Sequence, residues 1–280
     1  MKPPAPVRAC LVDVEGVLVR DKAYRPVAGS IAWLEKLDVR GLPWCLVSNN
    51  TTHAPDELVA DLVAAGFPVT PARLVGALGL GADWLRQRGR RRILWLGHPR
   101  LAGWWQDQGF APGGPEDCDT VVLGVNPQLG VADLDAALPA VRDRGLDLLC
   151  LHRNAFWLDA EGRRRLGPGA WAAALEAAGA GRRAFTVGKP AEPIYHEALK
   201  RVAAAPAETL FISDDPVADL VTAGRLGMRT AFVLSGKHAD CAVLGSLDQE
   251  DWPDIVSASL ADIDIDEAGA GGAAERTTRP

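Results

Sequence analysis

Apolar runs alternate with amphipathic stretches along most of this chain, and the alternation is its clearest structural signal. Short runs rich in Val, Leu and Ile are typical of buried strands. They predict strands at residues 8–13, 43–47, 93–96, 120–123, 146–151, 184–187, 209–212 and 229–234. Apolar residues at helical spacing predict helices that include 55–65, 131–142, 193–204 and 217–226. Repeated strand–helix alternation predicts a doubly wound α/β fold, in which helices cover both faces of a parallel sheet.

The middle of the chain forms a strand–helix series of its own, with few acidic groups at its strand ends. We interpret residues 77–183 as an inserted α/β domain and residues 1–76 and 184–261 as a discontinuous core. Residues 262–280 are first acidic and then rich in Gly and Ala, and they have little periodic apolar content. We predict that they form a disordered tail.

Composition narrows the class of protein. With 280 residues, 48% of them hydrophobic, the chain can build a core domain and an inserted one. A net charge of -6 argues against a general nucleic-acid binder, which usually carries a basic face. The sequence has no run of about 18 apolar residues and no signal-peptide pattern, so we expect no membrane association. The five cysteines form no C-x-x-C pair, and Cys10, Cys45 and Cys150 lie inside apolar runs, so we expect these three to be buried free thiols in a cytoplasmic protein.

Polar residues suited to one kind of chemistry follow several of the predicted strands. Asp13 follows the first strand, Ser48 and Asn49 the second, and Asp214 a late one, while Lys189 precedes a predicted helix. In an open parallel sheet, ligands bind beyond the carboxyl ends of the strands. The fold would therefore bring these segments together.

Cleavage of a phosphate ester needs this set of groups. A carboxylate can attack phosphorus and divide one difficult step into two easier ones. Mg²⁺ and a lysine can neutralise the approach of two anions, and one or two carboxylates suffice to hold the metal. Hydroxyl and backbone N–H donors then hold the phosphoryl oxygens.

The four segments resemble, in order, the four motifs of the haloacid dehalogenase superfamily, and the resemblance covers residues from about 8 to 240. The insertion between the second and third motifs resembles the large α/β cap of the NagD-like subfamily IIA. The segments Leu151 to Trp157, Gly167 to Gly169 and Val233 to Lys237 are similar to the phospholysine/phosphohistidine/inorganic pyrophosphate phosphatase-like branch. The resemblance implies a Rossmann-like core, a cap domain and a Mg²⁺-dependent phosphatase.

The resemblance also assigns roles to the motif residues. Asp13 would be the nucleophile and a metal ligand, and Asp214 would be the second carboxylate on Mg²⁺. Ser48 and the backbone at Asn49 would bind the phosphoryl group. Lys189 would bridge nucleophile and phosphate. Asp219 would orient Lys189 or a metal-bound water.

Position 15 departs from the pattern of the superfamily. Its phosphatases usually carry Asp there as the general acid and base, with the main-chain carbonyl on Mg²⁺, and here the residue is Glu15. A displacement of about 1 Å can cost a catalytic group on the order of a hundredfold in rate. We therefore predict slow turnover of simple esters. The alternative is a weakened enzyme that acts as a phospho-ligand-binding or regulatory protein.

Three residues of the insertion are candidates for substrate contact: His152, Arg153 and Trp157. They lie near the end of one predicted strand, where a loop could face the active site, but an exposed loop without function fits equally well. The run Arg163 to Arg165 is interpreted as a solvated loop. Asp215 precedes Pro216 and suits a helix N-cap, whereas Asp214 is assigned to the metal.

Small phosphomonoesters are the expected substrates, with pyrophosphate or phosphoamides implied by the branch resemblance. A receiver-like phosphoacceptor domain also combines Asp, Mg²⁺ and Lys on a parallel sheet, but it would be one compact domain without the insertion. Dehalogenase chemistry needs no Mg²⁺ and is disfavoured by Asp214 and Lys189. A homodimer is compatible with this interpretation.

Overall fold

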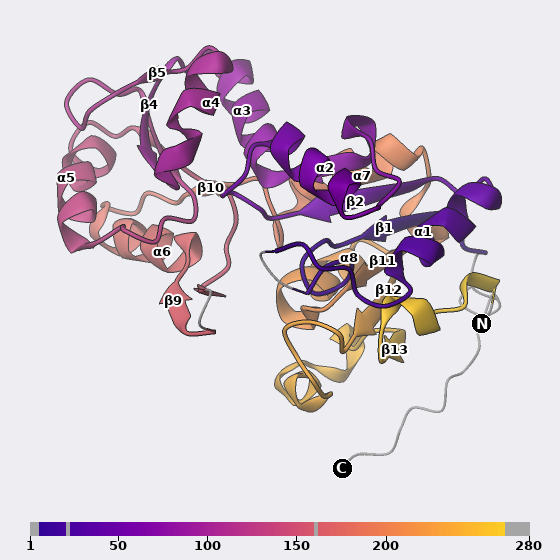
Figure 1. Cartoon of the computed structure of the whole chain (residues 1–280). Helices are drawn as coiled ribbons and strands as arrows, with labels where there is room; N and C mark the ends of the chain where they lie inside the picture. The colour runs from indigo at the N-terminus through magenta and orange to yellow at the C-terminus, as the bar shows by residue number, and fades with distance from the viewer. Residues whose placement is uncertain (1–5, 21–22, 160–161, 267–280) are drawn as a thin grey trace. The chain divides into compact units, whose positions relative to one another are not determined.

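A computed structural model describes residues 6–20, 23–159 and 162–266 of the chain (Figure 1). The chain divides into two compact units. The first comprises Met1–Val47, Val59–Val75 and Tyr195–Pro280, and the second comprises Ser48–Leu58 and Gly76–Ile194. No helix in the described ranges is both long and apolar enough to cross a bilayer.

The first unit is built on a six-stranded sheet with the order β13-β12-β11-β1-β2-β3. Its strands are β1 (Ala9–Val12), β2 (Trp44–Ser48), β3 (Leu74–Gly76), β11 (Thr209–Ser213), β12 (Arg229–Val233) and β13 (Ile255–Ser257). The pairs from β13 through β2 are parallel. Strand order runs one way from β1 to β3 and the other way from β11 to β13. The boundary between β1 and β11 is therefore a topological switch point, where open α/β sheets bind ligands.

Helices and tight turns connect these strands (Figure 1). The helices of these chain segments are α1 (Ser30–Val39), α2 (Pro55–Ala64), α7 (Glu192–Val202) and α8 (Val221–Arg225). A π-helical turn, η4 (Pro216–Leu220), precedes α8. The 3-10 turns of the described residues are η1 (Pro71–Arg73), η2 (Pro99–Leu101), η3 (Pro206–Glu208), η5 (Ala242–Ser246), η6 (Gln249–Asp251) and η7 (Leu260–Asp262).

The segment after η7 corrects the predicted start of the tail. Ile263 and Ile265 are buried, and the Trp33 indole donates a hydrogen bond to the Ile263 carbonyl at 3.0 Å. Arg40 forms a two-point ion pair with Asp266. Two alternating isoleucines give this short segment enough apolar surface to pack, so residues 262–266 are not a tail. The rest of the predicted tail, 267–280, lies outside the described residues.

The second unit contains a five-stranded parallel sheet and a small antiparallel hairpin. The sheet has the order β10-β7-β6-β4-β5, from β4 (Arg92–Leu96), β5 (Ala111–Pro112), β6 (Thr120–Leu123), β7 (Asp147–Cys150) and β10 (Phe185–Thr186). The hairpin pairs β8 (Phe156–Leu158) with β9 (Arg164–Leu166). The helices are α3 (Ala77–Gln87), α4 (Ala102–Asp107), α5 (Val131–Arg142) and α6 (Pro168–Ala178).

Alternate residues of the central strands in the second unit belong to two different cores. Val121 and Leu123 of β6 pack in a cluster with apolar residues of α5 and α6. Val122, between them, packs in another cluster with residues of α3 and α4. Successive side chains of a strand point to opposite faces, so a continuous apolar run serves both. This is why Thr120–Leu123 was visible as a strand in the sequence.

The parallel α/β architecture confirms the predicted fold class. One strand lies elsewhere than expected. Residues 184–187 were assigned to the core, but β10 pairs with β7 in the second unit's sheet. The run Arg163 to Arg165, interpreted as a loop, largely forms β9, because antiparallel pairing with β8 satisfies its backbone. The domain limit at 76/77 stays a prediction.

Candidate active site

Two acidic residues stand at the switch point of the first sheet. Asp13 follows β1, and its N–H donates to the Ile212 carbonyl of β11 at 2.9 Å. Asp214 follows β11 directly. Both residues are only 7% exposed. Because β1 and β11 are neighbouring parallel strands, the sheet itself brings these two acids to one edge, as the sequence analysis predicted for their segments.

Two glycines close around the Asp214 carboxylate. Gly16 has a φ of +83°, a left-handed conformation that favours glycine. A Cβ at Gly16 or at Gly236 would collide with Asp214 Oδ2. The Ser235 hydroxyl also donates to the Gly16 carbonyl at 2.7 Å, which ties the two loops together. The absence of side chains at these two positions leaves room for the carboxylate.

Lys237 contacts both acids that follow β11. Its backbone N–H donates to Asp214 Oδ2 at 2.6 Å, and its ammonium Nζ lies 2.5 Å from Asp215 Oδ2. Burial opposes ionisation of Asp215, but the charge and hydrogen bond of Lys237 outweigh it and keep the pKa of Asp215 below its usual value. Asp215 also accepts the Ala218 N–H at 3.0 Å, which confirms its predicted role as an N-cap before Pro216.

Asp219 lies in the π-helical turn behind these acids. Its Oδ2 accepts a hydrogen bond from the Ser213 hydroxyl at 2.6 Å, and its carbonyl accepts one from the Tyr195 hydroxyl at 2.9 Å. Burial raises the pKa of Tyr195, and the negative charges of Asp219, Asp13 and Asp215 raise it further. The turn is therefore held from both sides, while the predicted role of Asp219 towards Lys189 stays a prediction.

The donor chemistry at this edge suits a hard cation. Among the described residues, no group of three or more His, Cys, Asp or Glu side chains could hold a metal. A soft or borderline metal usually binds such groups, whereas Mg²⁺ is held by one or two carboxylates and keeps several waters. The residues predicted to hold the metal, Asp13, Asp214 and the Glu15 carbonyl, would offer oxygen donors only; their assignment to a metal stays a prediction. Glu15 itself is half-buried.

In the second unit, Asn49 fixes the backbone of Lys189. The Asn49 side-chain oxygen accepts the Lys189 N–H at 2.9 Å, and its amide nitrogen donates to the Lys189 carbonyl at 3.0 Å. A Cβ at Gly188 would collide with the same Asn49 oxygen. Lys189 is 2% exposed. A role had been predicted for the Asn49 backbone alone, and the structure adds this side-chain contact.

Ser48 ends β2 and is completely buried. Its hydroxyl accepts the Asn50 N–H at 3.0 Å and so forms a local turn after the strand. Asn50 in turn accepts N–H groups from Thr52 and His53. The turn orders the backbone at residues 49–53, and the role of Ser48 in phosphoryl binding stays a prediction.

Arg153 is engaged within the second unit. Its guanidinium lies 2.5 Å from Glu176 and donates to the Thr186 hydroxyl at 3.2 Å. Burial opposes ionisation of Glu176, but the hydrogen bonds and charge of Arg153 outweigh it and keep the pKa of Glu176 below 4.5. His152 is buried at 3% exposure. Substrate contact by these two residues stays a prediction.

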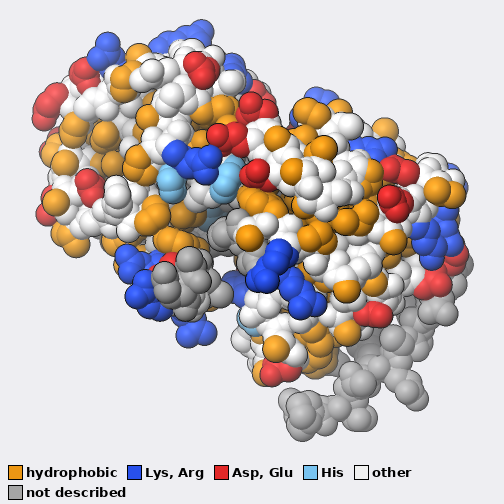
Figure 2. Space-filling model, viewed as in Figure 1, with side chains coloured by type: hydrophobic (Ala, Val, Ile, Leu, Met, Phe, Trp, Pro, Cys, Tyr) orange, Lys and Arg blue, Asp and Glu red, His pale blue; other side chains and the backbone are white. Residues whose placement is uncertain are grey.

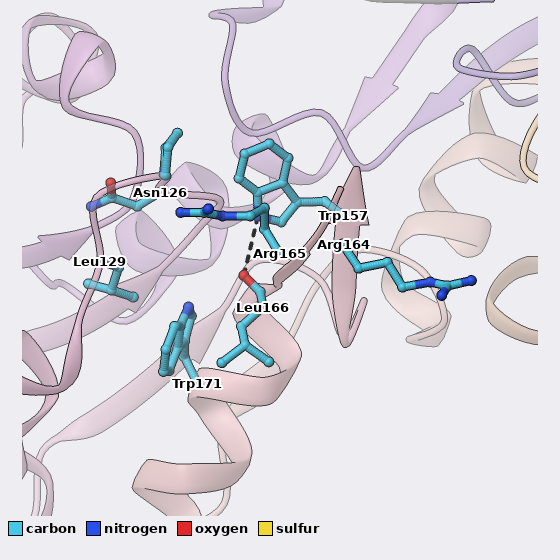
Figure 3. A pocket seen from close by; sticks show the side chains of 8 residues that line it. Asn126, Leu129, Trp157, Arg164, Arg165, Leu166 and Trp171 are labelled. Carbon is cyan, nitrogen blue, oxygen red and sulfur yellow. Dashed lines mark hydrogen bonds between the residues drawn. The ribbon is translucent and has the colours of Figure 1, made fainter. Parts of the chain in front are cut away.

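Trp157 lies at a pocket of the second unit (Figure 3). Its indole N–H donates to the Leu166 carbonyl at 3.2 Å, across the β8–β9 hairpin. The other lining residues are Asn126, Pro127, Leu129, Arg164, Arg165, Leu166 and Trp171. Trp157 is thus the one sequence-predicted site residue that the structure places at this pocket.

The contacts of Gly236, Lys237 and the Asn49 side chain were not predicted from the sequence. The segment Ser235 to Lys237 follows β12, the strand next to β11, so its place at a strand end was a usable signal. The contact between Asn49 and Lys189 gave no sequence signal, because it joins residues far apart in the chain.

Two family models, several curated proteins and several solved structures are similar to this chain. A model described as haloacid dehalogenase-like hydrolase matches residues 10–111, and one described as HAD-hydrolase-like matches 186–263. Chronophin from Bos taurus is 30% identical over 244 residues, covering 81% of this chain and 80% of chronophin. Ribonucleotide monophosphatase NagD from Escherichia coli is 25% identical over 276 residues, covering 92% of this chain and 99% of NagD. The solved structure of p-nitrophenyl phosphatase from Archaeoglobus fulgidus matches with a TM-score of 0.80 at 22% identity, over 92% of this chain and 98% of that one.

Proposed function

From the premise that this chain belongs to the haloacid dehalogenase-like hydrolase family, among its NagD-like phosphatases, we propose that it hydrolyses small phosphomonoesters with Mg²⁺ through an aspartyl-phosphate. One observation carries the proposal. Asp13 and Asp214 stand buried at the ends of neighbouring strands at the switch point, and two glycines enclose the Asp214 carboxylate. Such a pair of oxygen donors suits both a nucleophile and a magnesium ligand.

In the proposed first step, a carboxylate oxygen of Asp13 attacks phosphorus and the bond to the ester oxygen breaks. The Glu15 carboxyl gives its proton to the leaving alkoxide. In the second step Glu15 takes a proton from water, whose oxygen attacks the aspartyl-phosphate and releases inorganic phosphate and the free Asp13 carboxylate. Bound Mg²⁺ would neutralise charge on the phosphoryl oxygens. Asp13, Asp214 and the Glu15 carbonyl would hold it.

Ser48, the Asn49 backbone and Lys189 are proposed to bind the phosphoryl group. The support is their order in the family motifs and the hydrogen bonds by which Asn49 holds both backbone groups of Lys189. A buried lysine whose backbone is fixed loses little entropy when it meets an anion. His152, Arg153 and Trp157 are proposed to contribute to substrate selection, and Asp219 to the support of Lys189.

The names of the relatives suggest the substrate classes to examine first. NagD is named for ribonucleotide monophosphates and the Archaeoglobus fulgidus enzyme for p-nitrophenyl phosphate. Pyrophosphate and phosphoamides follow from the branch resemblance. We propose action in the cytoplasm on small soluble substrates, without nucleic acid or membrane partners, and compatible with a homodimer.

A phosphate-release screen over these classes tests the function. The wild-type protein should release phosphate with Mg²⁺ and not with EDTA, whereas Asp13→Asn, which has nearly the same shape, should release none. Asp215→Asn tests whether Asp214, and not the adjacent Asp215, is the metal ligand. The charge that this variant removes is paired with Lys237 and is not assigned to the metal. If Asp13→Asn retained wild-type activity, the proposed nucleophile would be wrong.

Glu15 favours a second candidate function, a phospho-ligand-binding protein with little turnover. Its side chain is longer than Asp by one methylene, and the backbone around it is fixed by the bridge between Glu15 and Val19. Metal-dependent binding of a phosphorylated ligand without phosphate release would support this candidate. Phosphate release at each binding event would exclude it.

A further inference from the structure

One lysine of the first unit, Lys237, contacts both of the acids that follow β11. Its backbone N–H donates to Asp214 Oδ2 at 2.6 Å. Its ammonium Nζ lies 2.5 Å from Asp215 Oδ2. A cation that approached this edge of the sheet would therefore meet two carboxylates that Lys237 already orients.

Both carboxylate oxygens of Asp215 are engaged. Oδ1 accepts the Ala218 N–H at 3.0 Å, and Oδ2 accepts a hydrogen bond from the Lys237 ammonium. The side chain of Asp215 is 10% exposed and that of Lys237 is 29% exposed, so water screens this pair less than it screens a surface pair. A hydrogen bond between two ionised groups is about twice as strong as a neutral one. The positive charge of Lys237 therefore occupies the position at Asp215 that a metal ion would otherwise take.

The Asp214 carboxylate is crowded on one side only. Besides accepting the Lys237 N–H, its Oδ2 would lie 1.9 Å from a Cβ at Gly16 and 2.0 Å from a Cβ at Gly236. The backbones of these two glycines therefore pack against Oδ2 and take the space that a cation would need beside it. A metal held by Asp214 would bind through Oδ1, so this carboxylate would be a ligand through one oxygen and not through two.

The number of carboxylate oxygens distinguishes Mg²⁺ from Ca²⁺, the two common hard cations. Mg²⁺ demands octahedral geometry, keeps several waters and is held by few carboxylates. Ca²⁺ takes roughly six to eight oxygens, and carboxylates often bind it through both of theirs. An edge at which Asp214 offers one oxygen and Asp215 offers none therefore fits Mg²⁺ better than Ca²⁺.

We propose that Lys237 selects Mg²⁺ over Ca²⁺ at the phosphatase site. Its ammonium withholds Asp215 from the metal, and its backbone N–H keeps Asp214 to one oxygen. Lys237 is thus a positioning residue, because it acts through two carboxylates and not on the substrate. The inference rests on the proposed function, since it takes Asp214 as the metal ligand.

Calorimetric titration of the full chain with MgCl₂ and with CaCl₂ measures the selectivity as the ratio of the two dissociation constants. In Lys237→Met, Asp215 Oδ2 can turn to the cation, so the ratio should shift about tenfold or more towards Ca²⁺. Lys237→Arg keeps the positive charge and should stay within about threefold of wild type. Lys200→Met is the matched control, because Lys200 pairs with Glu197 at 3.8 Å but is 81% exposed on α7. Its ratio should equal that of wild type.

A double variant tests whether the effect acts through Asp215. Lys237→Met combined with Asp215→Asn removes the ammonium together with the carboxylate that it held, so the ratio should return towards wild type. Asp214→Asn should abolish the specific binding of both cations. Exposed acids add only weak background binding, because on the face shown in Figure 2 they are scattered among Lys and Arg side chains. Lys237→Gln repeats the single substitution, so that the test does not depend on the folding of one variant.

Three results would overturn the proposal. The first is a wild-type ratio in Lys237→Met and Lys237→Gln proteins that melt as cooperatively as wild type. The second is a shift that persists in the double variant, because Lys237 would then not act through Asp215. The third is specific cation binding that survives Asp214→Asn.

The readout is metal binding, so it is separate from the test of the phosphatase. Phosphate release with Mg²⁺ by the wild type, together with an unchanged ratio in Lys237→Met, would keep the phosphatase and reject the role of Lys237. A shifted ratio without phosphate release from any ester would reject the reaction and keep the role of Lys237 at the metal.

Discussion

At the scale of single residues, the fit of one proton donor governs the proposed reaction. Glu15 lies two residues after Asp13, and Gly16 after it turns in a left-handed conformation beneath Asp214. The backbone here cannot move freely, because Gly16 N–H donates to the Val19 carbonyl at 2.8 Å. The additional methylene of Glu15 must therefore be accommodated by the side chain alone.

Glu15→Asp should raise the rate of hydrolysis of simple phosphomonoesters. The shorter side chain would place the carboxyl where this family usually has it, and a correction of about 1 Å can change the rate up to about a hundredfold. Steady-state phosphate release measures the effect. Glu35→Asp, on the exposed side of α1, is the control for the substitution itself. An unchanged or lower rate in Glu15→Asp would show that Glu15 does not limit the wild type.

The ion pair between Arg153 and Glu176 should make the second unit sensitive to acid. In the folded protein the pKa of Glu176 lies below 4.5, with burial opposing the effect and Arg153 causing it. Because the pKa of Glu176 is lowered, the ion pair stabilises the folded protein fully above pH 4.5. This contribution to stability disappears as the pH falls through the folded-state pKa. Glu176→Gln should therefore lower the melting temperature at pH 7. The difference from wild type should shrink as the pH is lowered; a constant difference would contradict the pair's role.

At the scale of elements, the loop after β12 contacts the acidic edge of the first sheet. Ser235, Gly236 and Lys237 contact the Gly16 carbonyl and the carboxylates of Asp214 and Asp215. Mutation of a group that orients a metal ligand typically lowers the metal affinity roughly 10- to 100-fold. This loop should therefore tune the metal affinity of the site.

Gly236→Ala should raise the Mg²⁺ concentration for half-maximal activity about tenfold or more. The new Cβ would collide with Asp214 Oδ2, and moving this carboxylate disturbs a proposed metal ligand. Direct Mn²⁺ titration gives a readout that does not depend on turnover. Gly245→Ala is the control, because a Cβ there meets no atom within 4 Å. Equal metal affinity in the two variants would remove the loop from the metal site.

Strands that are buried on both faces could be predicted from the sequence. Segments that are defined only by their contacts with distant residues could not. Thr120–Leu123 is a continuous apolar run because it serves two cores. The β9 strand is rich in arginine and is defined by its pairing with β8, which no local pattern reveals. Likewise, Asp13 and Asp214 were found from their strand ends, whereas the Asn49 side chain required the folded contact with Lys189.

At the scale of the whole molecule, the cysteines report on the integrity of the fold. Cys10, Cys45 and Cys150 are buried, as predicted; Cys118 is buried too, and Cys241 is exposed. Burial raises the pKa of Cys10, Cys45 and Cys150 to about 12. Only the thiolate reacts readily, so these thiols should be inert in the folded protein.

Titration with a thiol reagent should show one fast group in the native protein and five in denaturant. Cys241→Ser should remove the fast group and leave the melting temperature unchanged. Fast reaction of a second thiol in the native Cys241→Ser protein would show that one of the buried cysteines is reached by local opening.

The pairing of β1 with β11 also determines the order in which the two units can fold during translation. Ala9 is aligned with Thr209, so β1 cannot pair with β11 until most of the chain has been translated. Every strand of the five-stranded sheet, from β4 to β10, emerges before β11 does. Because folding can begin during synthesis, the second unit can complete its sheet before the first unit does. Until then, β1 leaves the ribosome as an apolar edge that a chaperone can cover.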